Sequence, residues 1–211
     1  TLKLALLAVV ISALVGIPLG IISALKPNSI LDSVLTTISL FFASVPSFWL
    51  GLMFMLIFSL ILGWLPSSGI GTWKHYIMPV ITLVLPSAAY LARLTRSTMI
   101  DAINQDYIRT AKSKGATTPR VMFLHALKNA MMPVVTQLGM SFASLLGGAL
   151  ITEMVFGLPG FGSAIVNAIK TKDIPIVMGG IIFLSATFIL IMLAVDLIYA
   201  FIDPRVKDMY E

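Results

Sequence analysis

Few residues of this chain could carry out chemistry on their own, and they do not gather into a catalytic or metal-binding set. The 211 residues include no cysteine, which removes disulfides, thiolate nucleophiles and cysteine metal sites. The two histidines, His75 and His125, lie far apart in the sequence and form neither a metal site nor part of a Ser/His/Asp arrangement. A Gly-x-x-x-x-Gly-Lys-Ser/Thr phosphate loop is also absent from the sequence. We therefore predict no enzyme activity and no metal, cofactor or ATP bound by this chain.

The composition predicts that the chain lies in a lipid bilayer. Hydrophobic residues make up 58% of the sequence and charged residues 11%, and the mean hydropathy is +1.01. A soluble domain carries roughly a quarter charged residues, so a soluble fold could not hide this much apolar side chain. Intrinsic disorder is excluded for the same reason. We interpret the net charge of +5 as sorting of Lys and Arg between the two sides of a membrane, not as nucleic-acid binding.

Five apolar runs are long enough to cross a bilayer, since a spanning helix needs about 20 residues. They cover residues 4–25, 34–63, 76–92, 131–152 and 174–202. Their continuous hydrophobicity predicts an all-α polytopic membrane protein and not a β-barrel. The second run is long enough to tilt or to include an interfacial end. Trp64, Trp73 and Tyr76 fall at ends of the second and third runs, where an aromatic belt is expected.

The basic residues divide unequally between the two sides. Ten of them fall in the first loop, in the segment 93–128 and in the tail 203–211, which five spans place on one side. The four on the other side are Lys3, Lys74, Lys170 and Lys172. The positive-inside rule makes the richer side cytoplasmic. The sequence therefore predicts the N-terminus of this chain outside and its C-terminus in the cytoplasm.

Small residues recur at a spacing of four within two of the runs. Gly16 and Gly20 form one such pair, and Gly139, Ala143 and Gly147 form a longer stripe. This spacing lets helix backbones approach closely within lipid. We interpret it as packing inside the chain, with a pathway lining or contact with a second copy as the alternative.

The loop of residues 101–130 carries the most specific pattern. Its first part predicts a short helix that Asn104 or Asp106 can cap, with Gly115 in the left-handed position after its end. Thr118 and Pro119 then suit the N-cap and first turn of a second helix. The result is an angled helix–Gly–helix that projects from the membrane and suits insertion into a groove on another protein.

At these residues the sequence resembles a known family. Arg109-Thr110-Ala111, followed after three residues by Gly115, is similar to the EAA loop of ABC-importer permeases. The segments 106–115 and 125–130 resemble, more narrowly, the dipeptide/oligopeptide/nickel branch, which tolerates Arg109 in place of the consensus Glu and a longer interval from Gly115 to Pro133. The segment 155–162, Val-Phe-Gly-Leu-Pro-Gly-Phe-Gly, resembles the external turn of the B-type subunit of that branch, and the segment 196–205 resembles its C-terminal ending.

The resemblance implies a type I ABC-importer transmembrane domain over residues 1–202, followed by a cytoplasmic tail, and a first helix upstream of this chain. It implies alternating access driven by two ABC ATPase subunits that use ATP and Mg²⁺, with a second related permease and an external solute-binding protein as further partners. The residues expected to contact the ATPase are Tyr107, Arg109, Thr110, Ala111, Lys114, Gly115 and Ala116. Those expected to meet the binding protein, within the external segment 153–173, are Phe156, Gly157, Pro159 and Gly160.

Several functions stay open at this stage. Within the family the cargo is a dipeptide or oligopeptide, or alternatively nickel or another metal complex. A stand-alone channel or secondary transporter would normally carry ionisable residues along a central path, and the four cleanest apolar runs have none. A membrane enzyme lacks a catalytic set. Asp196, near the inner end of the last run, suits a hydrated or Arg-paired structural role better than a functional one.

Overall fold

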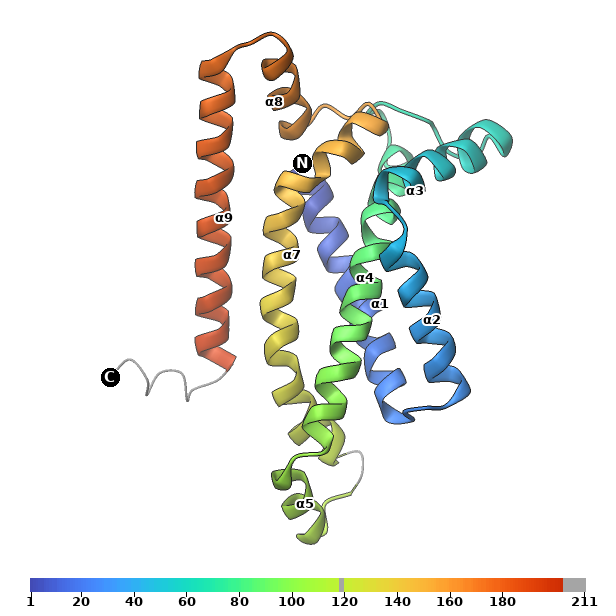
Figure 1. Cartoon of the computed structure of the whole chain (residues 1–211), viewed down its shortest axis with the longest axis vertical. Coiled ribbons are helices and arrows are strands. Elements are labelled where there is room, and N and C mark those ends of the chain that lie inside the picture. The colour runs from blue at the N-terminus through green and yellow to red at the C-terminus, as the bar shows by residue number, and fades with distance from the viewer. Residues whose placement is uncertain (118–119, 203–211) are drawn as a thin grey trace.

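The computed structural model describes residues 1–117 and 120–202, and every regular element in these ranges is a helix (Figure 1). The all-α prediction is confirmed. The elements are α1 (Leu2–Leu25), α2 (Ile30–Ser44), α3 (Ser47–Phe54), the π-helical η1 (Met55–Ile61), α4 (Lys74–Ile103), α5 (Asp106–Ser113), the π-helical η2 (Val121–Ala126), α7 (Leu127–Val155), α8 (Phe161–Lys170) and α9 (Ile174–Ile202). The predicted helix start at Thr118 and Pro119, the side chain of Asp196 and the tail 203–211 lie outside what the structure describes.

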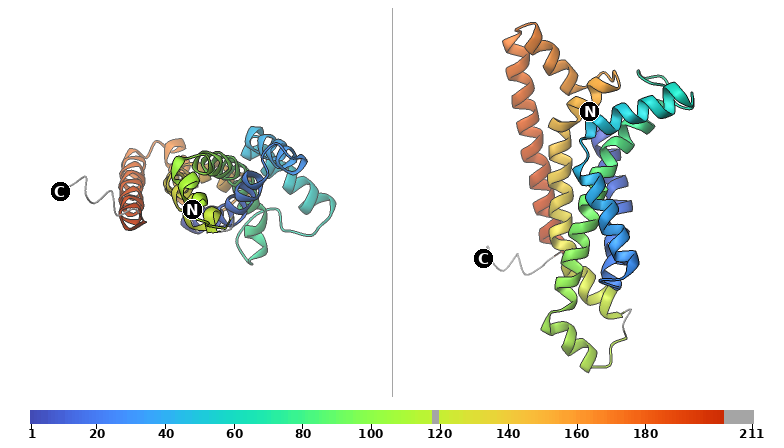
Figure 2. Two further views of the ribbon diagram at one scale, coloured as in Figure 1. Left: turned by 90° about the horizontal axis from the view of Figure 1, so that it is seen from below. Right: turned by 45° about the vertical axis from the view of Figure 1, so that its right-hand side comes forward.

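Three long helices form the centre of the molecule. Helices α1, α4 and α7 contact one another, α2 packs on α4, and α9 packs on α7 and α8. Figure 1 and Figure 2 show α5 at one end of this bundle and α3 and α8 at the other. We call these the α5 end and the α8 end.

The close approach of α1 and α4 depends on the two glycines of α1. A Cβ added at Gly16 would lie 2.6 Å from the carbonyl oxygen of Ala88, and one at Gly20 would lie 2.5 Å from that of Ala92. Ordinary contacts of a Cβ fall between 3.4 and 4 Å, so the two backbones meet where no side chain fits. The interpretation of this pair as packing inside the chain is confirmed.

The second apolar run, residues 34–63, is not one straight helix, which corrects the sequence interpretation. Its two parts, Ile30–Ser44 and Ser47–Ile61, are bent by 95°. Pro46 has φ −60°, and Val45 before it is extended with φ −82° and ψ 127°, because a proline disfavours the helical conformation of the preceding residue. With 15 residues, α2 is about 22 Å long, shorter than the roughly 30 Å hydrocarbon core of a bilayer.

The other apolar runs form helices that are long enough to span. Among the described residues, four helical segments qualify by length and hydropathy, namely Leu2–Leu25, Lys74–Ile103, Val121–Gly147 and Ile174–Val195, and the bent pair makes a fifth if it counts as one span. Helix α4 extends well beyond the predicted 76–92, so Arg93 and Arg96 lie inside it. Pro79 and Pro86 also lie inside α4, and neither ends it.

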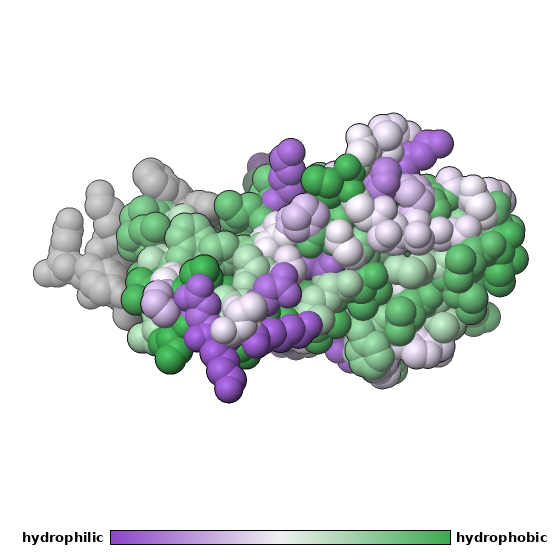
Figure 3. All heavy atoms as spheres, turned by 90° about the horizontal axis from the view of Figure 1, so that it is seen from above, coloured by the Kyte–Doolittle hydropathy of each residue, from purple (hydrophilic) through white to green (hydrophobic). Residues whose placement is uncertain are grey.

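The arm formed by α3 and η1 leaves the bundle sideways at the α8 end. The end-on view of Figure 3 shows hydrophobic side chains along the right-hand end of this face, with hydrophilic residues in separate groups over the rest of it. Leu60 and Ile61 are 72% and 70% exposed. Trp64 and Trp73 are exposed as well, which agrees with the predicted aromatic belt.

Candidate functional site

The site predicted in the loop 101–130 is built around a glycine turn at the end of α5. Gly115 has φ +82°, its N–H donates to the carbonyl of Lys112 at 2.9 Å, and the N–H of Ala116 donates to the carbonyl of Ala111 at 3.2 Å. These two bonds form a Schellman motif, which satisfies the last carbonyls of the helix and turns the chain sharply. The predicted left-handed position of Gly115 is confirmed.

The start of α5 differs from the sequence prediction. Helix α5 begins at Asp106 after Gln105, which makes no side-chain cap bond, and Asn104 is the C-cap of α4. Neither predicted residue is therefore the N-cap. Asp106 instead lies in the first turn, where a carboxylate favours the helix dipole, and pairs with Arg109 at 3.6 Å. Both side chains are highly exposed, so this ion pair adds little stability.

One apolar side chain anchors α5 to the bundle. Ile108 is 1% exposed and belongs to a buried cluster with Met99 and Ala102 of α4 and Val121 of η2. Burying such a side chain contributes about 1.5–3 kcal/mol. We call the unit of α5, Gly115 and η2 the elbow, and it is fixed to the end of α4 by this contact.

The predicted coupling residues lie on the exposed side of the elbow. Tyr107, Arg109, Thr110, Lys114 and Gly115 are exposed, whereas Ala111 and Ala116 are half-buried. All of them except Arg109 line one pocket of about 430 Å³, together with Arg120 and His125. The structure thus brings most of the predicted set onto one surface, which His125 also lines.

At the α8 end, one predicted contact residue is buried, which is a correction. Phe156 is 1% exposed, and its ring would lie 3.2 Å from a Cβ at Gly51 of α3. The side chain therefore fixes α3 to the end of α7 and cannot meet a binding protein in this conformation. Gly157 and Pro159 are exposed and Gly160 is half-buried.

A buried carboxylate that the sequence analysis did not single out organises the same segment. Glu153 is 1% exposed, and its Oε2 accepts the N–H of Ser163 at 3.1 Å. The hydroxyl of Thr1 donates to Oε1 of Glu153 and accepts the N–H of Phe161 at 2.7 Å. A negative charge at the first turn of α8 suits its dipole. The carboxylate thereby ties the start of α8 to the end of α7.

We expect Gly160→Ala to release this contact. A Cβ at Gly160 would lie 2.0 Å from Oε1 of Glu153, so the buried carboxylate must leave the amide of Ser163, at a cost of about 1–3 kcal/mol for the unsatisfied group. Hydrogen exchange of the backbone amides of α8 should become faster. Gly179→Ala in α9, where no described atom lies within 4 Å of the added Cβ, is the control. Unchanged protection of α8 in Gly160→Ala would show that the carboxylate contact does not hold this helix.

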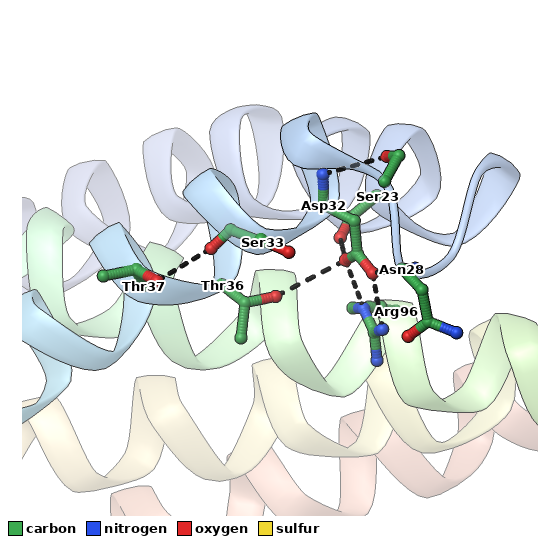
Figure 4. Close-up of polar contacts among 8 residues, drawn as sticks. Ser23, Asn28, Asp32, Ser33, Thr36, Thr37 and Arg96 are labelled. Atoms are coloured by element: carbon green, nitrogen blue, oxygen red, sulfur yellow. Dashed lines mark hydrogen bonds and ion pairs between the residues drawn. The ribbon is translucent and has the colours of Figure 1, made fainter.

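A second polar cluster lies where the loop between α1 and α2 meets α4 (Figure 4). Asp32 is 3% exposed, and its two carboxylate oxygens accept Nε and Nη2 of Arg96 at 2.6 and 2.7 Å. The hydroxyl of Ser23 donates to Oδ1, and the N–H of Asn28 donates to Oδ2 at 2.8 Å. The local sequence Ser29-x-x-Asp32 is a helix-start signature, but nothing in it indicates the partner on α4.

A membrane-spanning helical bundle with an exposed elbow anchored at one end and no catalytic set in its sequence is typical of a transport subunit that another protein drives. The family described as binding-protein-dependent transport system inner membrane component matches residues 16–208. The chain is 41% identical over 207 residues to the glutathione transport system permease protein GsiC of Escherichia coli strain K12. The identity to GsiC of Salmonella typhi is the same. Each alignment covers 98% of this chain and 68% of the relative.

Solved structures share the fold. The inward-facing MetNI methionine ABC transporter superposes with a TM-score of 0.76 at 18% identity, over 96% of this chain and 92% of that chain. An amino acid ABC transporter with histidines gives a TM-score of 0.68 at 20% identity, over 97% and 89%. This chain belongs to the binding-protein-dependent permease family of ABC importers, in its dipeptide/oligopeptide/nickel branch. It is a multi-pass inner-membrane subunit that is not an enzyme, and a separate subunit hydrolyses ATP.

Proposed function

We propose that this permease moves small peptides, of dipeptide to oligopeptide size, that an external binding protein delivers. The observation that supports this cargo is the 41% identity, over 98% of the chain, to permeases named for glutathione, which is itself a tripeptide. Nickel or another metal complex is the alternative cargo that the same branch leaves open.

We place the contact with the ATPase at the elbow. Its exposed residues include Arg109, Lys112, Lys114 and Arg120, so this surface is basic, and Ile108 holds it firmly on α4. A rigid projection of this kind can transmit a force without bending. ATP and Mg²⁺ would bind to two ATPase subunits, whose closure would push the elbow and shift the helices between two packed states.

The charge distribution supports the orientation proposed for the chain. The basic elbow makes the α5 end cytoplasmic by the positive-inside rule, so the N-terminus of this chain and α8 lie outside. Gly157, Pro159 and Gly160 would then face the binding protein. A second related permease would complete the solute path, since one subunit of four or five spans is too small to enclose it.

Uptake by the complete transporter in proteoliposomes tests the cargo. Labelled glutathione, a dipeptide, a longer peptide and Ni²⁺ are each offered with the binding protein, with and without internal ATP. We expect ATP-dependent accumulation of at least one peptide and none of Ni²⁺. ATP-dependent Ni²⁺ uptake without uptake of any peptide would overturn the peptide assignment and leave the permease class untouched.

A further inference from the structure

We propose that Asp32 and Arg96 form a joint that makes α2 move together with α4 when the elbow is displaced. The proposal rests on the function proposed for the elbow. Neither residue touches the elbow or the expected contact surface for the binding protein, so both are positioning residues. The joint is defined by Asp32, Arg96, Ser23 and Asn28.

The joint connects α1, the loop after it, α2 and α4. Ser23 comes from α1, Asn28 from the loop, Asp32 from the first turn of α2 and Arg96 from α4. The guanidinium of Arg96 contacts both oxygens of Asp32, and two parallel N–H···O bonds fix orientation as well as distance. In Figure 4 the guanidinium of Arg96 meets the carboxylate from below, whereas the side chain of Asn28 points away, because Asn28 contributes its backbone N–H. One carboxylate thus holds three helices in a single relative position.

Helix α2 packs on α4 with Leu35 and Phe42 half-buried, but few of its side chains are fully buried. All fifteen of its residues are described, and only Asp32 and Ser39 among them are buried, so no apolar side chain of α2 is fully packed against the bundle. Ile30, Leu31 and Phe41 are at least half exposed. Beyond the bend at Pro46, α3 meets the end of α7, where a Cβ at Gly51 would lie 3.2 Å from the ring of Phe156. The segment from α2 to α3 is therefore held at both of its ends, and at the α5 end Asp32 and Arg96 provide an ionic contact.

Helix α4 leads directly from the joint to the elbow. Arg96 lies seven residues before Ile103, the last residue of α4, a distance of about 10 Å along the axis. Met99 and Ala102, on this same stretch, pack against Ile108 of the elbow. Displacement of the elbow therefore reaches Arg96 along one unbroken helix. A bidentate ion pair resists sliding and rotation, whereas an apolar contact of the same size would allow both.

A neutral double variant separates this role from stability. Removing one partner of a buried ion pair leaves an unpaired charge and is strongly destabilising, whereas removing both charges costs much less. Asp32→Asn keeps the size of the side chain, and Arg96→Gln is shorter but places an amide nitrogen at about the position of Nε, so one hydrogen bond between the two side chains can still form. Arg93→Gln is the matched control, because Arg93 lies one turn from Arg96 on α4 and has no ion pair among the described residues. The guanidinium carbon of Arg93 lies 6.0 Å from the ring centre of Tyr90.

Coupling is measured in the complete transporter as solute moved per ATP hydrolysed. We expect the neutral double variant to assemble with the ATPase and to hydrolyse ATP at its basal rate, but to move about tenfold less solute per ATP, in the range by which coupling mutations act. Arg93→Gln should retain the ratio of the native chain. A double variant with an unchanged ratio, or an equal loss in Arg93→Gln, would overturn the joint.

A distance measurement on the otherwise native chain keeps the test decisive if the double variant fails to assemble. The chain has no cysteine, so spin labels can be placed at Ile30→Cys and Asp101→Cys, both exposed. We expect the same narrow distance distribution in the nucleotide-free and ATP-trapped complexes. A change of several ångströms between the two would refute the joint. A cross-link from Ser113→Cys to the ATPase tests the elbow separately, so its absence would refute the proposed function instead.

Discussion

Gly20→Leu should prevent the chain from folding into a transporter subunit, and we expect this to be the largest effect of any single substitution discussed. A Cβ at this position would lie 2.5 Å from the carbonyl oxygen of Ala92 and 2.6 Å from Cβ of Thr95. The first of these is a backbone atom that cannot turn aside. Helices α1 and α4 must therefore separate, at a cost at or above the roughly 1–3 kcal/mol of an overpacked core. The separation would also displace Arg96, whose backbone nitrogen lies 3.1 Å from the same Cβ.

The measurement is the monodisperse fraction on size exclusion in mild detergent, together with the thermal midpoint. Gly179→Leu makes the same change on an exposed stretch of α9, where no described atom lies within 4 Å of the new Cβ, and should behave as the native chain. If Gly20→Leu elutes and melts like Gly179→Leu, the close contact of α1 and α4 is not needed for folding.

Features that depend on local sequence could be predicted. The spacing of Gly16 and Gly20 indicates close helix packing, and the conformation of Gly115 follows from a glycine placed after a short helix with a basic end. The apolar runs likewise predict long helices, because spacing, turn residues and hydropathy act over a few residues. The family resemblance was visible for the same reason, since its motifs are short and contiguous.

Features that depend on the position of distant segments could not be predicted. Arg96 lies 64 positions after Asp32, and in the sequence it looks like one more basic residue near a cytoplasmic loop. Phe156 stands in a glycine-rich turn that looks exposed, but the arm begun by Pro46 folds back and brings Gly51 over it. Pro46 itself was visible, but the hydrophobicity around it continues without a break, and hydropathy carries no information about direction.

Each of the two polar clusters attaches one peripheral helix to the mostly apolar central bundle. Glu153 fixes α8 to α7 at one end, and Asp32 fixes α2 to α4 at the other. Apolar contacts within lipid provide little directional preference, because lipid tails solvate the same side chains equally well. Charged hydrogen bonds do favour one relative orientation of the helices that they join. This explains why buried carboxylates stand at the positions where peripheral segments join the central helices.

Gly115→Val should abolish most ATP-driven uptake while the chain still inserts into the membrane. Valine does not tolerate φ +82°, and the left-handed conformation costs a residue with a Cβ roughly 1–2 kcal/mol. Since no described atom lies within 4 Å of the added Cβ, the strain is conformational, and the chain relieves it by giving up the Gly115 and Ala116 hydrogen bonds to the end of α5. The elbow would then lose its fixed angle. One to two kcal/mol shifts such an equilibrium about five- to thirtyfold, and uptake should fall by that factor.

Gly115→Asn distinguishes the required backbone conformation from other effects of adding a side chain. Asparagine adopts the left-handed region more readily than other residues with a Cβ, so this variant should retain most uptake although its side chain is comparable in size to valine. Both variants should bind the ATPase. Ile108 should stay buried in its cluster, since it lies on the face of α5 that packs on the bundle and not on the exposed face. Equal losses of uptake in the two variants would show that uptake depends on the exposed surface at Gly115 and not on the backbone conformation of the turn. Native uptake in Gly115→Val would show that the elbow does not transmit force through this turn.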